Sequence, residues 1–251
     1  MPPTSAVPAP GAPAQPAASD AADAPAAAEP AFAPQPVAPF KASYEAWYKG
    51  KLAGSAILQV VKGEGDLWRL DLQITAEHGV VSLLRLNIQQ STVFQVLDGE
   101  RYRPLSQSTV RKALFGGKAM TAVYDWNAHS ARWQGDIKKQ RREPVPLQDG
   151  DLSSLLLDLA IMRDATPGKV LTYRVVDNGR ARQYQYAVSA QTEIVPVGEL
   201  SYDALRVARS NGNDEQIFWV ASGVPTPVRI LQRNDGEDAV DLRLIDYQGV
   251  Q

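Results

Sequence analysis

His78 and His129 are the only imidazole side chains in this chain of 251 residues, and cysteine is absent. A Ser-His-Asp or Cys-His site needs a nucleophile, a base and a group that orients the base, yet the sequence contains no Gly-x-Ser-x-Gly elbow. The two histidines lie 51 positions apart, without the His-Glu-x-x-His spacing of a zinc hydrolase. We therefore expect a non-enzymatic protein with no catalytic residues, no metal site and no cofactor.

Two further patterns resemble ligand sites and are better explained by turns. Residues 115–118, Phe-Gly-Gly-Lys, lack the full spacing of a phosphate-binding loop, and no Ser or Thr follows the Lys. Asp235, Glu237, Asp238 and Asp241 form an acidic cluster that could attract calcium, but their spacing matches no calcium-binding loop. Both patterns are typical of solvated β-hairpins.

The strongest binding candidate is apolar. Residues 79–86, Gly-Val-Val-Ser-Leu-Leu-Arg-Leu, are the most apolar stretch after Phe40. They predict a buried strand, a short helix or a loop that contacts an acyl chain or a membrane. Burying about three such side chains contributes several kcal/mol, so we infer an apolar ligand or lipid on the concave face of a sheet. The residues expected to bind it are Trp68, Leu70, Val81, Leu83, Leu84, Leu86, Leu155, Leu156 and Leu159, with Arg85 and Arg229 as orienting polar groups.

The elements that position these residues are mostly strands. In Phe40–Tyr48, apolar residues occupy alternate positions, the period of a half-buried strand. The same alternation, bounded by Gly, Asn and Asp turns, predicts strands at 54–61, 67–76, 92–97, 105–113, 118–126, 130–134, 169–176, 181–189, 202–209, 215–220, 228–233 and 239–247. Asp-Asn-Gly at 177–179 is the strongest hairpin signal.

One helix is predicted, over about 151–164. Its leucines follow helical spacing, Asp149 or Asp151 can cap it, and Thr-Pro-Gly at 166–168 stops it. Because no helices alternate with the strands, the pattern disfavours a parallel α/β sheet. The sequence predicts a mainly β fold, a large antiparallel sheet curled into a barrel or half-barrel, in which the helix covers one opening.

A change in composition near Phe40 divides the chain. Residues 2–39 contain 11 Pro, 15 Ala and no Lys or Arg, too few large apolar side chains to offset the entropy of ordering. We expect residues 1–39 to be a disordered tether and residues 40–251 to be a single β-rich domain. The chain has a formal charge of −2 and the tether carries three acids, so the domain is close to neutral. Such a domain has no global field for nucleic acid, and none is expected as a partner.

Membrane contact has two candidate segments. One is the apolar stretch Val80–Leu86, and the other is the basic run Lys138–Arg142, which is otherwise a solvated loop. No stretch is long and apolar enough to span a bilayer as a helix, and the N-terminus lacks the regions of a signal peptide. A Pro/Ala tract before a β domain is common in bacterial envelope proteins. We therefore expect a periplasmic or envelope-associated location, with the targeting segment or anchor absent from this chain.

Several short motifs, in order along 40–250, carry a resemblance. They are Asp-Gly at 98–99 with Arg-Pro-Leu at 103–105, Val-Tyr-Asp-Trp at 123–126, Asp-Leu-Ser-Ser-Leu-Leu at 151–156, Phe-Trp-Val at 218–220 and Pro-Thr-Pro-Val-Arg-Ile at 225–230. The chain resembles the bacterial exported family catalogued as domain of unknown function 3108. The resemblance implies an envelope location and a large antiparallel sheet, loosely similar to the half-barrels of periplasmic lipoprotein carriers. It implies no catalytic residues.

The leading functional hypothesis is an envelope domain that binds an apolar ligand or an envelope partner. One alternative is a structural or scaffold module that contacts envelope proteins or peptidoglycan. It predicts an apolar and aromatic patch on the outside of the sheet. A second alternative is a carboxylate-dependent hydrolase of envelope glycans or lipids. It predicts a cleft with a strongly perturbed Asp or Glu.

Overall fold

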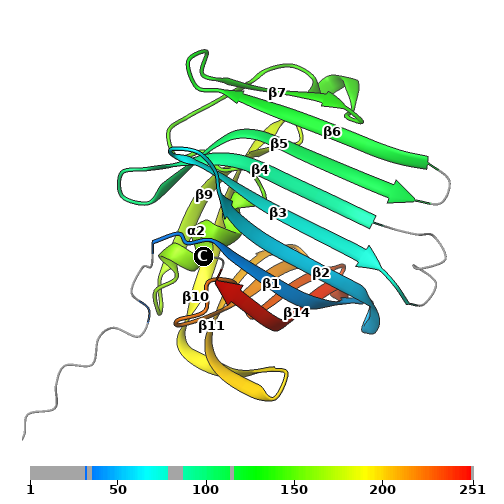
Figure 1. Cartoon of the computed structure of the whole chain (residues 1–251), viewed down its shortest axis with the longest axis vertical. Helices are drawn as coiled ribbons and strands as arrows, with labels where there is room; N and C mark the ends of the chain where they lie inside the picture. The colour runs from blue at the N-terminus through cyan, green and yellow to red at the C-terminus, as the bar shows by residue number, and fades with distance from the viewer. Residues whose placement is uncertain (1–31, 33–35, 79–86, 114–115, 250–251) are drawn as a thin grey trace, which may run out of the picture. The chain divides into compact units, whose positions relative to one another are not determined.

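The computed structural model describes residue 32 and residues 36–78, 87–113 and 116–249. All of them belong to one compact unit that begins at Phe32. In this part of the chain, fourteen strands form one antiparallel sheet (Figure 1). The strands are β1 (Phe40–Tyr48), β2 (Lys51–Lys62), β3 (Leu67–Ala76), β4 (Asn87–Leu97), β5 (Arg101–Ala113), β6 (Gly116–Asp125), β7 (Ser130–Gly135), β8 (Val145–Pro146), β9 (Val170–Asp177), β10 (Arg180–Val197), β11 (Leu200–Asn211), β12 (Asp214–Ala221), β13 (Arg229–Asn234) and β14 (Glu237–Gly249).

The strand order follows the chain in two meanders. One meander runs from β1 to β8 and the other from β9 to β14, and β1 pairs with β14 to join them. The β8 and β9 strands, which are neighbours in sequence, therefore form the two edges of the sheet. The sheet curls until it is nearly closed as a barrel, which confirms the predicted fold class.

Alternation of side chains explains which face is inside. In β1, Phe40, Ala42 and Tyr44 are buried, whereas Lys41 is exposed. The hairpin between β9 and β10 turns at Asn178 and Gly179, which have φ values of 50° and 66°. Positive φ at both positions suits Asn-Gly and matches the twist of the strands.

The helix α2 (Leu156–Asp164) lies between β8 and β9 in the chain and packs inside the curl. It begins at Leu156 rather than at Asp151, and neither Asp149 nor Asp151 caps it. The Asp151 carboxylate instead accepts a hydrogen bond from Arg174 at 2.5 Å, and residue 152 forms a parallel β-bridge with Val175. These contacts keep the chain extended before the helix. The described residues contain two helical segments, α2 and the 3-10 turn η1 (Lys139–Arg141). Neither is long and apolar enough to cross a membrane.

Side chains bridge the region where the two edges approach. The Tyr124 hydroxyl on β6 donates to the Val176 carbonyl oxygen on β9 at 2.7 Å and lies 2.8 Å from Gln107 Oε1. The Gln107 amide on β5 donates to Asp177 Oδ1 at 2.7 Å. The sheet is therefore closed here by a polar seam, Gln107, Tyr124, Val176 and Asp177, in place of a continuous backbone ladder.

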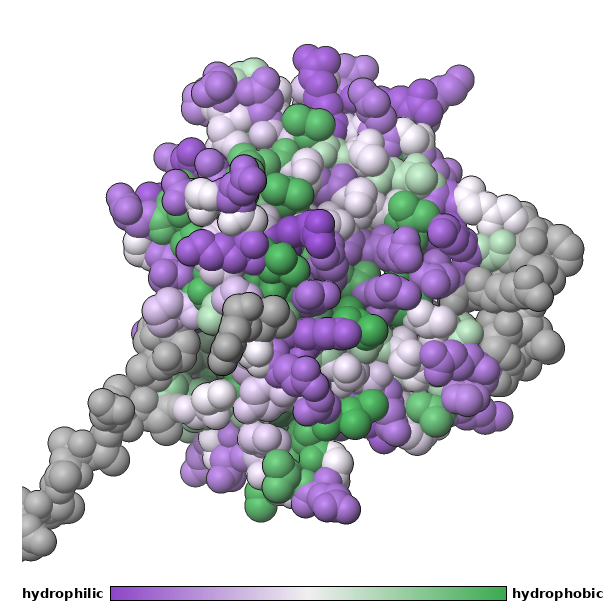
Figure 2. Space-filling view, viewed as in Figure 1, coloured by the Kyte–Doolittle hydropathy of each residue, from purple (hydrophilic) through white to green (hydrophobic). Residues whose placement is uncertain are grey.

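The main core fills the curl between α2 and the two meanders. A smaller core around Tyr124 and Trp133 lies under β6 and β7. The core also includes residues that the sequence assigned to the tether, because Phe32 and Val37 are partly buried against it. On the face seen in Figure 2, hydrophilic residues predominate and hydrophobic ones are scattered among them.

Candidate functional site

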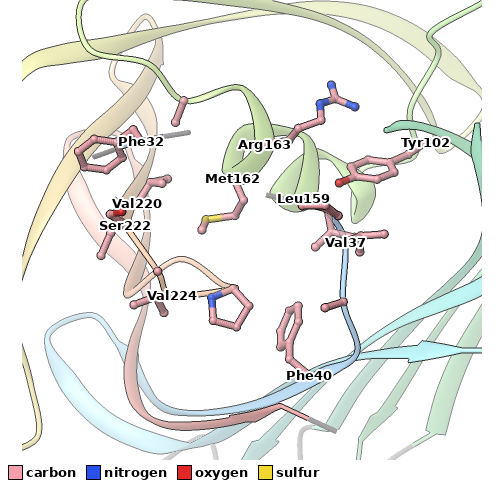
Figure 3. A pocket seen from close by; sticks show the side chains of 16 residues that line it. Phe32, Val37, Phe40, Tyr102, Leu159, Met162, Arg163, Val220, Ser222 and Val224 are labelled. Atoms are coloured by element: carbon pink, nitrogen blue, oxygen red, sulfur yellow. The ribbon is translucent and has the colours of Figure 1, made fainter. Parts of the chain in front are cut away.

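A cavity of about 300 Å³ lies at the end of the curl where β1 begins and β12 ends. We call it the helix-end pocket. Figure 3 shows the side chains around it, contributed by α2, the segment before β1, β5 and the loop after β12. The lining residues are Phe32, Pro36, Val37, Ala38, Phe40, Tyr102, Leu159, Met162, Arg163, Ala165, Val220, Ala221, Ser222, Gly223, Val224 and Pro225. Most of them are apolar, so the pocket suits an apolar group.

Local structure places each wall of the pocket. Leu159 and Met162 are one helical turn apart and therefore share one side of α2. The segment before β1 is held by a hydrogen bond of 3.2 Å from the Val37 amide to the Glu100 carboxylate. On the far side, Val224 is buried in the loop between β12 and β13.

The polar rim of the pocket is built around Arg163. Its guanidinium pairs with Asp164 at 2.6 Å, donates to the Glu100 carbonyl oxygen at 2.5 Å and lies 5.0 Å from the centre of the Tyr102 ring. Burial raises the pKa of Tyr102 to about 12, and the Arg163 charge opposes that rise. Arg163 is thus fixed in place with its charge balanced, and it can orient a polar end group at the rim.

A buried carboxyl group lies on the same helix. Asp158 is 9% exposed, and among the described residues none donates a hydrogen bond to its carboxyl group. Burial raises its pKa from 3.8 to about 7. Its charge contributes to the raised pKa values of Tyr44 and Tyr186, which burial dominates. Asp158 therefore faces the interior of the curl and is not part of the pocket lining.

The structure separates the residues that the sequence grouped as a ligand site. Trp68 and Leu70 on β3 lie in the main core, as do Leu155 and Leu156. Leu159 lines the helix-end pocket. Arg229 instead lies on the outer face, where it binds Asp241 through two hydrogen bonds of 2.8 Å. The remaining predicted residues, Val81, Leu83, Leu84, Arg85 and Leu86, lie outside the described residues, as does all of Val80–Leu86.

The other motifs occupy turns and surface contacts. His78 and His129 are exposed, and the backbone of His129 adopts a φ of 48° in the turn between β6 and β7. In the acidic cluster, Asp238 pairs with Arg233 at 2.7 Å and Asp241 pairs with arginines. The basic run contains η1, whose Arg141 carbonyl oxygen packs against Gly179.

Sequence reasoning did not identify several pocket residues. Phe32 and Val37 lie in the Pro/Ala tract, where they are among the few large apolar side chains. Their isolation among Pro and Ala was the sequence feature that could have identified them as buried residues. Met162 was assigned to the helix, and the pocket places it beside the loop containing Val224.

Comparisons with known proteins identify a family and one protein of similar fold. The sequence model of the family described as "Protein of unknown function (DUF3108)" matches residues 43–243. A beta-barrel-like protein of domain of unknown function DUF1849 from Brucella abortus has 9% identity and a TM-score of 0.53, covering 86% of this chain and 99% of that one. A DUF1089 family protein from Pseudomonas aeruginosa has 14% identity and a TM-score of 0.30, covering 82% and 91%. No curated protein matches the chain.

The Brucella structure, at this identity, supports the fold alone. The family match spans most of the chain and includes β2 to β13 in full, together with the loop after β12 that lines the helix-end pocket. It agrees with the resemblance read from the short motifs. The chain therefore belongs to the DUF3108 family of proteins of unknown function.

Proposed function

We propose that this domain binds an apolar ligand, such as the acyl chain of a lipid, in the helix-end pocket, without catalysing a reaction on it. The observation that carries the proposal is the apolar lining of a cavity of about 300 Å³ beneath Leu159 and Met162. This volume lies at the lower end of the range for small-molecule sites. Each methylene group buried there contributes about 0.8 kcal/mol.

The polar rim of the pocket favours an amphiphilic ligand rather than a pure hydrocarbon. Arg163 and the Ser222 side chain lie at the lining beside apolar residues. A ligand with one polar end can therefore leave that end at the rim while its chain lies against Phe40 and Met162. We place this activity in the bacterial envelope, as the Pro/Ala tract suggests, with envelope proteins as partners in ligand transfer.

The test begins with protein purified gently from its own envelope fraction. Native mass spectrometry followed by organic extraction should show a bound lipid or acyl species. A fluorescent fatty acid, cis-parinaric acid, should bind the isolated wild-type protein. The amount of bound probe should rise in proportion to the protein concentration. A clean apo mass together with no response to cis-parinaric acid would overturn the proposal and favour the scaffold alternative, which cross-linking of partners would then examine.

A substitution that fills the pocket gives a more specific test of where the ligand binds. Met162→Trp should lower binding of cis-parinaric acid at least about tenfold, because the indole occupies the volume that the chain needs. Val170→Trp is the matched control, since Val170 is 65% exposed on β9 and lies away from the pocket. The control should bind like wild type. Equal binding by both variants would contradict this location for the site.

A further inference from the structure

A second cavity, of about 380 Å³, lies at the opposite end of the curl, where β11 ends and β12 begins. Its lining includes Arg182, Tyr184, Arg209, Gln216 and Gln232, and we call these five residues the arginine groove. The turn residues and charged side chains at the ends of β11, β12 and β13 complete the lining. Its lining is polar, in contrast to the helix-end pocket. The groove is therefore a separate site, and it does not depend on the function proposed above.

Strand register places the groove on the concave face. Gln232 pairs with Gln216, which pairs with Arg209, so the three side chains form a row across β13, β12 and β11. Tyr184 pairs with Tyr173, whose hydroxyl donates to the Ala160 carbonyl oxygen of α2 at 3.1 Å. Cross-strand partners share a face, and therefore this row faces the helix side of the sheet.

Arg209 is held firmly but not neutralised. Its guanidinium lies 4.2 Å from the ring centre of Tyr184 and 5.9 Å from that of Tyr186. Its Nε is buried and has no hydrogen-bond partner in the structure. Within the described residues, no acidic side chain forms an ion pair with Arg209 or Arg182. Two acids also line this cavity, and both have other partners: Asp214 accepts a hydrogen bond from the Asp235 amide at 3.0 Å, and Glu215 pairs with Arg233 at 2.8 Å.

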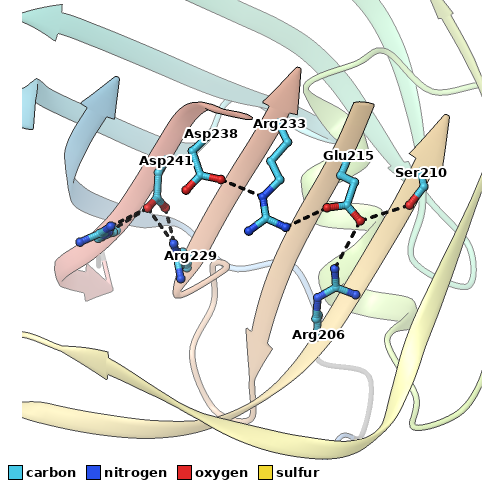
Figure 4. A network of polar contacts seen from close by, with 8 residues as sticks. Arg206, Ser210, Glu215, Arg229, Arg233, Asp238 and Asp241 are labelled. Carbon is cyan, nitrogen blue, oxygen red and sulfur yellow. Dashed lines mark hydrogen bonds and ion pairs between the residues drawn. The ribbon is translucent and has the colours of Figure 1, made fainter. Parts of the chain in front are cut away.

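The outer face of the same strands shows the opposite arrangement (Figure 4). Arg206 on β11 pairs with Glu215 at 3.8 Å, and Arg233 pairs with Glu215 at 2.8 Å and with Asp238 at 2.7 Å. Asp241 similarly pairs with Arg229 and Arg243. Each of these guanidinium groups on the outer face thus has a carboxylate partner, whereas Arg182 and Arg209 have none among the described residues.

We propose that the arginine groove binds the phosphate group of an organic phosphate. A guanidinium group matches phosphate oxygens through paired N–H donors, and its contacts with anions are the strongest of protein hydrogen bonds. The Gln216 and Gln232 amides add donors for further oxygens. A cavity of about 380 Å³ is larger than a bare phosphate, so the ligand carries an organic part that lies along Tyr184. A lipid headgroup and a soluble phosphate ester share this chemistry.

The experiment uses the whole chain with three probes: inorganic phosphate, sn-glycerol 3-phosphate and vesicles of phosphatidic acid in phosphatidylcholine. Isothermal titration measures the soluble probes and co-sedimentation measures the vesicles. Arg209→Gln should weaken binding at least about tenfold, as expected for the loss of a charge-assisted contact. Arg206→Gln, on the same strand but the outer face, should bind like wild type.

The pattern of binding identifies the source of the phosphate. Binding of sn-glycerol 3-phosphate that Arg209→Gln abolishes supports a soluble ester, and vesicle binding alone, lost in the same variant, supports a lipid headgroup. If Arg209→Gln does not fold, as judged by its thermal unfolding, Arg182→Gln takes its place because Arg182 is exposed. The proposal is overturned if wild-type protein binds none of the three probes, or if Arg206→Gln loses as much binding as Arg209→Gln. Neither result bears on the helix-end pocket, whose probe is a fatty acid.

Discussion

At the scale of single residues, Asp158 is the carboxyl group that folding disfavours most clearly. Burial raises its pKa from 3.8 to about 7, so between these values the folded protein holds a proton that the unfolded chain has released. The folded state then binds more protons, and its stability falls as the pH rises through this window. The contribution of Asp158 is most favourable below pH 3.8 and reaches its full penalty above about pH 7.

Replacing this carboxyl group should reveal the penalty. Asp158→Asn is expected to stabilise the protein more at pH 8 than at pH 5, by about 2–3 kcal/mol, since each pKa unit corresponds to 1.36 kcal/mol. Urea unfolding at the two pH values measures the difference. Asp149→Asn, at an exposed loop position, controls for the general effect of removing a negative charge and should show no such pH dependence. A constant difference between Asp158→Asn and wild type would refute the assignment.

The sequence indicated that Asp158 is unusual, but it did not indicate which residues surround it. It is the only charged residue in the run 155–161, Leu-Leu-Leu-Asp-Leu-Ala-Ile, and an isolated acid in an apolar run indicates a buried or functional group. Its neighbours Tyr44 and Tyr186 come from β1 and β10. Only tertiary structure brings them together, as it also brings Val37 to Met162.

At the scale of elements, the β9–β10 hairpin offers a direct test of turn chemistry. Gly179 has a φ of 66°, and a Cβ atom there would lie 2.1 Å from the Arg141 carbonyl oxygen. Gly236 has a φ of 81° with open space around it. Gly236→Ala should lose about 1 kcal/mol from backbone strain alone, and Gly179→Ala should lose more because its turn must also move away from η1. Urea unfolding measures both, and equal losses would show that Arg141 moves without cost.

Boundaries that depend on neighbouring residues could be predicted from the sequence. Boundaries that depend on contacts with distant residues could not. Strand β3 has the predicted bounds, Leu67–Ala76, because alternation and turns define it without outside help. Strand β10 extends to Val197, past the predicted end at 189, with an irregular register between Val188 and Thr192. The start of α2 shifted because Arg174, distant in sequence, binds Asp151. Pairing across the fold decides these boundaries.

At the scale of the whole domain, the sequence predicted the curled antiparallel sheet, while the manner of closure came from the structure. The polar seam at Tyr124 and Gln107 uses side chains with no periodic signature. Outside the seam, the two ends of the curl differ in chemistry, one apolar and one rich in arginine. That difference follows from which residues happen to end each strand on the inner face, and alternation alone does not report it.

The β1–β14 ladder also predicts an order of events in folding. Every other ladder among the described strands joins neighbours in sequence, whereas this one must close a loop of nearly the whole domain. Distant contacts form slowly because loop closure costs entropy before any contact compensates it. Leu244→Ala, opposite Tyr44 in this ladder, should therefore speed unfolding and leave the refolding rate nearly unchanged. Leu70→Ala, within the first meander, should slow refolding. Stopped-flow kinetics distinguishes the two, and a slowed refolding of Leu244→Ala would place the joining of the meanders before the barrier instead of after it.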